Sequence, residues 1–563
     1  CVTTVCTHTD RQATRVLVQG PMPRVLFVAA AVAAASVAAA PSTSALFGSA
    51  KTTRDLFAPA TTGDLFPRSS TTSERDETGE PGESGESGES GESGVVGADV
   101  LDYDFRGRGD VGAISALFAR VLAVGIDDVP FVFLIDASLV CSAKPDASRS
   151  DLCYELRTAP ATSGKAIQVS ATSGPDAAYG AAMYLRAYCN MSFSWDRAGG
   201  DNTNDGFATK VMAGEASWPA LYNHDDGAGQ WRLRDISYGF NVCTHSYSHV
   251  WYQFETAAEH FGQSWQGLLD WMALNGINLH LAYTGQEEVY RKVYNSFGVD
   301  DVTFRAWSNG PAHLTWSRGQ SMHGVGGPLP QEFMTSQWHL QRQILERSRA
   351  LGIVPILPAF QGNVPPAMAD LFPGANITVQ DAHWGGGSAA WLDSTDPLFQ
   401  SIGDKFMSAI IADFGMDTDG DGVGDVTEHW YEADGLFTSG DPPWRRRMGE
   451  ADEHAGEQAG AATDAEMDAA MDHESFIHAR QAYLAMNSTD PEARWMYQGW
   501  IWNNGQYDDV QLPQVMAAFK AAVPSGRLLV SDMWSEWSPI SQPLSSTGLP
   551  YLWGTLQNFG GTL

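Results

Sequence analysis

One stretch, residues 265–293 (WQGLLDWMALNGINLHLAYTGQEEVYRKV), limits the possible folds of this chain more than any other. Apolar residues in its first part recur at a spacing close to 3.6, which predicts an amphipathic helix: Trp265, Leu268, Leu269, Met272 and Leu274. Gly276 is placed to end that helix in a left-handed cap. The apolar run 277–282 then predicts a strand buried on both faces. This helix–strand step is the repeating unit of a parallel sheet.

The same unit recurs along the chain. We predict helices at 338–350, 397–414, 475–486 and 510–523, and strands at 231–236, 277–282, 353–357, 430–431, 495–500, 528–531 and 551–556. Seven parallel strands alternating with helices predict an α/β fold, a (β/α)₈ TIM-type barrel over 222–563 without its last strand. An open doubly wound sheet is the alternative, although no glycine-rich phosphate loop follows the first strand. Because a barrel without one strand exposes two sheet edges, we expect the sequence to be a fragment.

The region before the barrel divides into four parts. Residues 95–206 have the pattern of a small N-terminal α/β domain, with helices at 113–124 and 176–188 and strands at 129–135 and 167–171. Residues 46–94 are rich in Ser, Gly and Glu and predict a disordered linker. Residues 22–45 start at a Met and continue as an Ala-rich apolar run, which predicts a secretory signal peptide, with a membrane anchor as the alternative. Residues 1–21 are then upstream sequence.

A secretory route has consequences for cysteine and asparagine. Cys141 and Cys153 are spaced so that they can pair across a short loop. Asn190, Asn376 and Asn487 each begin an Asn-x-Ser/Thr triplet and can carry glycans in the secretory pathway. We therefore expect a lysosomal, vacuolar or extracellular protein.

The composition excludes some partners. The formal net charge is −33, which argues against nucleic acid and anionic membrane surfaces as partners. No segment beyond the signal region is apolar enough to predict a membrane span. The 19 Trp residues suit a protein that stacks on flat faces such as sugar rings. The sequence does not predict the oligomeric state.

The predicted strand ends are polar and aromatic. A barrel has its active site at the carboxyl ends of its strands, and those ends here carry carboxylates, amides and Trp but no basic cluster. This mixture suits an uncharged polar ligand such as a sugar. Glycoside hydrolysis requires two carboxyl groups, for which the candidates are Glu287, Glu432, Asp434, Asp532 and Glu536. The residue pattern by itself does not choose among them.

Several motifs, in order and at compatible spacing, resemble the α-N-acetylglucosaminidase family, glycoside hydrolase family 89. They are NVCTHSYS, DWMALNGINLHLAYTGQE, GIVPILPAFQGNVP, QGWIW, GRLLVSDMWSE and LQNFGG, and the likeness runs from about Ile167 to the end. The resemblance implies a small N-terminal domain, a barrel and a helical C-terminal domain, the last absent here. It also implies cofactor-free exo-hydrolysis of terminal α-linked N-acetylglucosamine in heparan sulfate-type glycans, with retention. The sugar-pocket positions of the family match Asn241, Cys243, Tyr247, Trp316, Trp384 and Trp500.

The chain departs from the family at both catalytic positions. Where the family has an acid/base Glu after strand four, in a pattern like ADTFNE, this chain reads ADGLFTSGDPPW, with Ser439 or Thr438 at the Glu position. Neither residue can act as a general acid, so Glu432 or Asp434 is our hypothetical substitute. The family's nucleophile follows the eighth strand and would lie beyond Leu563. We therefore expect this fragment by itself to be inactive, and a carbohydrate-binding barrel without catalysis is the alternative function.

Two insertions flank the predicted fourth strand. Residues 417–428 fit the twelve-position calcium loop, with Gly422 at the turn and oxygen ligands at Asp417, Asp419, Asp421, Asp425 and Glu428. A structural Ca²⁺ there would brace the loop after the strand. Residues 445–472 are charged and Ala-rich, and we expect a surface excursion, with a lid as the alternative.

Overall fold

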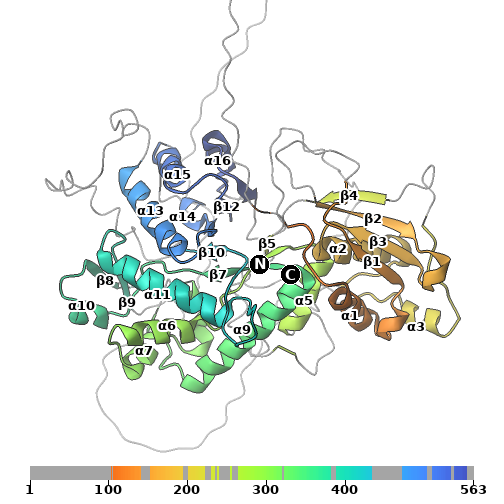
Figure 1. Cartoon of the computed structure of the whole chain (residues 1–563), viewed down its shortest axis with the longest axis horizontal. Coiled ribbons are helices and arrows are strands. Elements are labelled where there is room, and N and C mark those ends of the chain that lie inside the picture. The colour runs from red at the N-terminus through yellow and green to blue at the C-terminus, as the bar shows by residue number, and fades with distance from the viewer. Residues whose placement is uncertain are drawn as a thin grey trace, which may run out of the picture. The chain divides into compact units, whose positions relative to one another are not determined.

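The structure is a computed structural model. It describes residues 103, 105–140, 152–193, 201–221, 230–234, 238–239, 254–255, 264–319, 323–381, 388–433, 472–503, 507, 510–533 and 538–553, whose elements are labelled in Figure 1. The predicted signal peptide, the predicted linker and residues 445–471 of the second insertion lie outside these residues. None of the helices in the described ranges is both long and apolar enough to cross a membrane.

The N-terminal domain is built on a four-stranded sheet in the order β1-β3-β2-β4. Strand β1 is parallel to β3, whereas β2 is antiparallel to both β3 and β4. Ser173 caps the long helix α2 by accepting a hydrogen bond from the backbone of Asp176. The elements are α1 (Val111–Leu122), η2 (Ile126–Asp128), β1 (Phe131–Ile135), β2 (Leu152–Thr158), η3 (Ala161–Ser163), β3 (Ile167–Ala171), α2 (Gly174–Cys189), α3 (Phe207–Met212) and β4 (Gln230–Arg234).

Our assignment of residues 231–236 to the first barrel strand is wrong. The strand exists as β4, but it pairs antiparallel with β2, with Cys153 opposite Leu233. The first strand of the large sheet is instead β5 (Tyr238–Gly239), which pairs with β6 (Leu279–Leu281). A short apolar run predicts a strand but does not reveal which sheet that strand joins.

The large sheet confirms the predicted barrel class. Its seven strands lie in the order β13-β12-β11-β10-β7-β6-β5, and every neighbouring pair is parallel. The remaining strands are β7 (Val354–Pro358), β10 (Trp430–Glu432), β11 (Arg494–Gln498), β12 (Leu528–Asp532) and β13 (Tyr551–Trp553). The order follows the chain except for β8 (Ile377–Asp381) and β9 (Ser388–Leu392), an antiparallel pair outside the sheet that we did not predict.

Helices separate the strands as predicted. Gly276 follows α5 with φ +71 and Gly352 follows α9 with φ +80, the left-handed conformation in which only glycine is unstrained. The helices of this region are α5 (Trp265–Leu274), α6 (Gln286–Ser296), α7 (Asp301–Trp307), η6 (Pro311–His313), α8 (Leu314–Arg318), α9 (Gln331–Leu351), α10 (Ala367–Leu371), α11 (Pro397–Phe414), α13 (His473–Asn487), α14 (Trp500–Asn503), α15 (Gln511–Ala522) and α16 (Ser541–Thr547).

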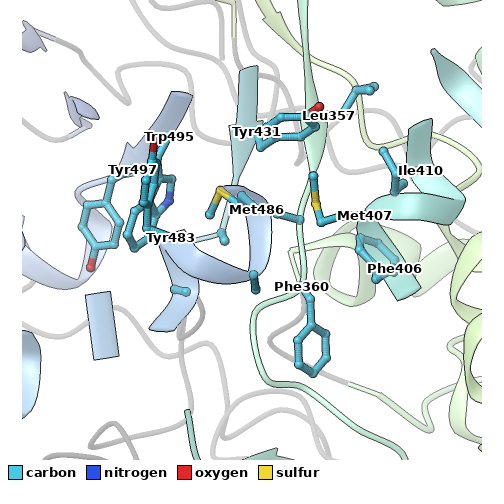
Figure 2. Packing of buried hydrophobic residues seen from close by; sticks show 14 of the residues in the cluster. Leu357, Phe360, Phe406, Met407, Ile410, Tyr431, Tyr483, Met486, Trp495 and Tyr497 are labelled. Atoms are coloured by element: carbon cyan, nitrogen blue, oxygen red, sulfur yellow. The ribbon is translucent and has the colours of Figure 1, made fainter. Parts of the chain in front are cut away.

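The main core lies between the large sheet and the helices that follow its strands. Figure 2 shows side chains of β7, β10 and β11 facing those of α11 and α13 in this core, among them Leu357, Tyr431 and Trp495 on the strands and Met407 and Met486 on the helices. His478 of α13 is also buried, and burial lowers its pKa to about 3.

A second cluster fills the interior of the large sheet. Its members come from β6, β7, β10, β11, β12 and β13 or the residues just after them, and they are joined by Leu152 of β2 and by Phe105, which precedes α1. The Phe105 ring stacks on Trp430, with ring centroids 6.5 Å apart, and Tyr103 meets the same Trp430 edge-on. Arg108 and Arg494 each place a guanidinium 4.8 Å from the centroid of the Tyr103 ring. Tyr103 and Phe105 therefore close the interior near the amino ends of the strands.

Ion pairs join the small domain to the barrel. Asp270 of α5 is 3% exposed and accepts hydrogen bonds from Arg120 of α1 and Arg347 of α9, at 2.7 and 2.6 Å. Because α1 belongs to the small domain, the buried carboxylate connects both domains. Cys153 of β2 is disulfide-bonded, and its predicted partner, Cys141, lies outside the described residues.

A polar cluster lies at the amino ends of β10 and β11, and we call it the lower cluster: Thr427, His429, Tyr431 and Asp490. The Asp490 carboxylate accepts hydrogen bonds from the Tyr431 hydroxyl at 2.7 Å and from Nδ1 of His429 at 2.8 Å. The backbone N–H of Glu492 donates to it as well, and Tyr431 is 2.7 Å from Oγ1 of Thr427. Burial alone would raise the pKa of Asp490, but these hydrogen bonds outweigh it and the pKa is lowered.

Candidate active site

Four buried polar side chains meet at the carboxyl ends of the strands. We call them the strand-end cluster: Tyr283 after β6, Gln361 after β7, Glu432 at the end of β10 and Gln498 at the end of β11. All four are at most 5% exposed. The carboxyl ends of the strands are where barrels place their active sites, so this cluster forms the base of the candidate site.

The Glu432 carboxylate is the centre of the strand-end cluster. Its Oε2 accepts hydrogen bonds from the Tyr283 hydroxyl and, at 3.0 Å, from Nε2 of Gln361. Nε2 of Gln498 donates in turn to the Tyr283 hydroxyl oxygen at 3.1 Å. Within the described part of the chain, no donor reaches the buried Oε1 of Gln498.

The predicted sugar-pocket residue Trp500 adjoins this cluster. It is the first residue of α14, two positions after Gln498, and it is partly buried against the interior cluster. Trp316 lies in α8, and its side chain is outside the described residues. Asn241, Cys243, Tyr247 and Trp384 also lie outside them, as do the catalytic candidates Asp434 and Glu536 and the family-position residues Thr438 and Ser439. Their assignment therefore stays a prediction.

The other two described carboxylate candidates have structural partners. Glu287, in the first turn of α6, forms a buried ion pair with Arg318, whose Nε lies 2.6 Å from the carboxylate. Asp532, at the end of β12, accepts hydrogen bonds from the Asn503 amide at 2.8 Å and from the backbone of Ile540. Asp532 thereby fixes the start of the loop that follows β12.

A buried histidine connects the α7–α8 region to the loop after β7, and sequence reasoning missed it. Nδ2 of Asn363 lies 2.5 Å from Nε2 of His323, and the His323 ring stacks on Trp307 at 4.0 Å. Burial lowers the pKa of His323 to about 3, so the ring is neutral. The one sequence signal was the position of Asn363 just after a predicted strand; nothing near His323 indicated burial.

Three of the predicted calcium ligands converge. Carboxylate oxygens of Asp417, Asp419 and Asp425 lie within 4.8 Å of one another, and all three residues are exposed. Gly422 has φ +87, as the turn of a calcium loop requires. Asp421 is outside this group, and Glu428 is turned away because its buried carboxylate pairs with Nε of Arg349 at 2.7 Å. The residues present fit a cation site with three carboxylates, and other oxygens would have to complete it.

The fold and the strand-end site together define a parallel barrel whose polar mouth suits a neutral, polar ligand. The family model of the alpha-N-acetylglucosaminidase (NAGLU) tim-barrel domain matches residues 237–434 and 460–563. The chain belongs to that family. It is 31% identical to human alpha-N-acetylglucosaminidase over 461 residues, covering 80% of this chain and 52% of the human protein.

Solved structures agree with the fold. The family 89 glycoside hydrolase from Clostridium perfringens, in complex with PUGNAc, matches with a TM-score of 0.56 at 23% identity, covering 78% of this chain and 41% of that one. A double variant of that hydrolase, in complex with its substrate GlcNAc-alpha-1,4-galactose, matches with a TM-score of 0.55 at 23% identity and the same coverage. The chain thus spans about half the length of the relatives it matches.

Proposed function

We propose that the protein carrying this chain is a retaining exo-glycosidase that removes terminal α-linked N-acetylglucosamine from glycans of the heparan sulfate type. The observation that carries this proposal is the family match, which covers every strand of the large sheet and therefore every strand end that builds the site. The C. perfringens relative, whose substrate contains α-linked GlcNAc, supports the sugar specificity.

Different residues of the chain would have different roles in such a site. Trp500 would stack on the sugar ring, and the polar side chains at the strand ends would fix the hydroxyl and acetamido groups. Retention requires a carboxylic acid that protonates the leaving oxygen and a carboxylate nucleophile about 5–5.5 Å away. We propose that the acid comes from the end of β10, where Glu432 and Asp434 are the two candidates. The nucleophile would follow the eighth strand, beyond Leu563.

The test is hydrolysis of an aryl α-N-acetylglucosaminide by the complete protein at acidic pH, beside Glu432→Gln and Asp434→Asn. We expect wild-type turnover and its collapse in the variant that lacks the acid. Turnover unaffected by both substitutions would place the acid outside this loop. Absence of turnover with N-acetylglucosamine still bound would favour a carbohydrate-binding protein instead.

We also propose that the loop 417–428 binds Ca²⁺ through Asp417, Asp419 and Asp425. The convergence of their carboxylates and the positive φ of Gly422 support this. Glu428 would not be a ligand; through Arg349 it would connect the loop to α9. We further propose that the protein follows the secretory route, as its residues 22–45 predict.

A further inference from the structure

Glu432 connects four strand ends that the sheet itself keeps apart. In the sheet, β7 lies between β6 and β10, so the hydrogen bond from Tyr283 to Glu432 crosses a strand. Gln498 reaches Tyr283 across both β10 and β7. Glu432 accepts hydrogen bonds from Tyr283 and from Gln361. Its removal would therefore leave these two buried donors without this acceptor.

The direction of these hydrogen bonds follows from the carboxylate. A carboxylate can only accept, so the Tyr283 hydroxyl must direct its proton to Glu432. The Tyr283 oxygen is then left to accept, which requires the NH₂ of Gln498 to point toward it. The orientation of the Gln498 amide is therefore set by a carboxylate two hydrogen bonds away.

Gln498 in turn is close in sequence to Trp500, on which we expect the sugar ring to stack; we call Trp500 the sugar platform. Gly499 follows it and donates from its backbone to the Ser531 carbonyl of β12 at 2.8 Å, and Trp500 begins α14 directly after. A change in the Gln498 amide would thus act at the residue that turns the chain toward Trp500. Glu432 could therefore affect how the sugar is bound without contacting the sugar.

We propose that Glu432 is a positioning residue of the glycosidase site, which through Tyr283 and Gln498 holds Trp500 in place, and that it is not the acid. This inference rests on the proposed function. Two features support it: the Glu432 side chain is fully buried, and its Oε2 is already occupied by two donors. An acid must direct its proton at the leaving oxygen, whereas this carboxylate oxygen faces its own protein. Asp434 is then the remaining candidate for the acid.

The leaving group separates positioning from acid catalysis. We would measure kcat and KM of the complete protein on a dinitrophenyl and a phenyl α-N-acetylglucosaminide, because the former needs little protonation on departure and the latter needs much. For Glu432→Gln we expect kcat/KM to fall about 10- to 100-fold on both substrates, with the alkaline limb of its pH profile retained. For Asp434→Asn we expect kcat/KM to fall on the phenyl substrate only and to lose its alkaline limb, whereas kcat falls on both substrates because the same residue is the base of the second step.

Two companion variants guard against a simple folding defect. Tyr283→Phe should reproduce the loss of Glu432→Gln, and the double variant should be no worse than the poorer single variant, because the two residues act as one unit. Asp490→Asn removes another buried, tyrosine-bound carboxylate, at the other end of the strands, and should leave kcat unchanged. A dinitrophenyl kcat/KM that stays at the wild-type value in Glu432→Gln, or wild-type values on both substrates, would overturn the proposal.

Binding separates this proposal from the proposed function. If the wild type hydrolyses neither substrate, the glycosidase assignment fails, and the affinity for N-acetylglucosamine measured by calorimetry decides the positioning role. Glu432→Gln and Tyr283→Phe should then each weaken binding about tenfold without adding in the double variant. Unchanged affinity in both would show that the strand-end cluster does not position the sugar platform.

Discussion

Strand β10 carries two adjacent residues that enter two different polar clusters. Tyr431 donates to Asp490 in the lower cluster, whereas the next residue, Glu432, accepts from Tyr283 in the strand-end cluster. Both clusters contain a buried hydrogen bond between a tyrosine and a carboxylate. The two clusters differ in how fully their polar atoms are hydrogen-bonded. The Asp490 carboxylate accepts from three donors. In the strand-end cluster, the buried Oε1 of Gln498 has no donor in the described part of the chain.

That difference separates stability from function. A buried acceptor without a donor costs about 1–3 kcal/mol, a cost that folding alone gives no reason to keep. In barrels the carboxyl ends of the strands carry the chemistry and the amino ends carry stability. We therefore expect the lower cluster to act on the free energy of unfolding and the strand-end cluster to act on turnover.

The largest effect should come from Asp490→Ala. It leaves Tyr431, His429 and the Glu492 N–H without their acceptor, and we expect a loss of about 3 kcal/mol in the free energy of unfolding. Urea unfolding measures this loss, and turnover per folded molecule should not change. A loss under about 1 kcal/mol would contradict the structural role of the lower cluster.

Removal of one hydroxyl from each cluster compares the two directly. Tyr283→Phe should lower kcat about tenfold, through the misplacement argued above, with a modest loss of stability. Tyr431→Phe should cost about 1 kcal/mol of stability and leave kcat within about twofold of the wild type. Equal kcat values in the two variants would end the distinction between the clusters.

As the pH is lowered, we expect the stabilising contribution of the main core to fall at a higher pH than that of the lower cluster. His478 has a folded pKa of about 3 against an ordinary value of 6.5, so its contribution to stability is complete above pH 6.5 and is lost as the pH falls toward 3. His478 should contribute about 1.4 kcal/mol per pH unit to the slope. In His478→Gln the slope should become shallower by that amount when unfolding is followed against pH, while buried His323, whose pKa is also about 3, keeps its own contribution.

Asp490 provides the control for this pH experiment. Its folded pKa lies below 3.8, so the stability it contributes is present above that value and is lost only as the pH falls below it. Asp490→Asn should therefore differ most from the wild type above pH 4 and keep the His478-dependent slope. A slope that becomes shallower in Asp490→Asn but is unchanged in His478→Gln would reverse the assignment.

The smallest effect should come from the calcium loop. We expect Ca²⁺ to raise the unfolding temperature by about 2 °C relative to chelator, and Asp425→Asn to abolish that increase. Asp421→Asn, in the same loop but outside the converging group, is the matched control and should keep the increase. An equal loss in both variants would mean that the loop binds through its overall charge.

The sequence predicted elements better than partners. Helix, glycine and buried strand recur at a spacing that identifies the parallel barrel, because each unit is a local pattern. Strand β4 was assigned to the wrong sheet because its pairing with β2 depends on residues far away along the chain. The hairpin of β8 and β9 was missed because it lies outside the repeat that we followed.

The sequence predicted where the site lies but not the roles of its residues. The polar strand ends indicated where Tyr283, Gln361 and Glu432 would lie, since parallel strands end at one edge. Tyr283 and Glu432 are 149 residues apart, so no local pattern could show that they share a hydrogen bond. Likewise, the loop spacing predicted that Glu428 is a calcium ligand, whereas in the structure its carboxylate forms an ion pair with Arg349 of α9.

The position of Phe105 has a consequence for how the chain folds. Phe105 and Leu552 belong to the same interior cluster, although nearly the whole described chain lies between them. During synthesis Phe105 emerges long before the last described strand, and its packing is complete only when that strand has joined the sheet. Contacts of such long range slow folding. The small domain lies between the two in the sequence, so a barrel cut out after that domain would lose the packing of Phe105.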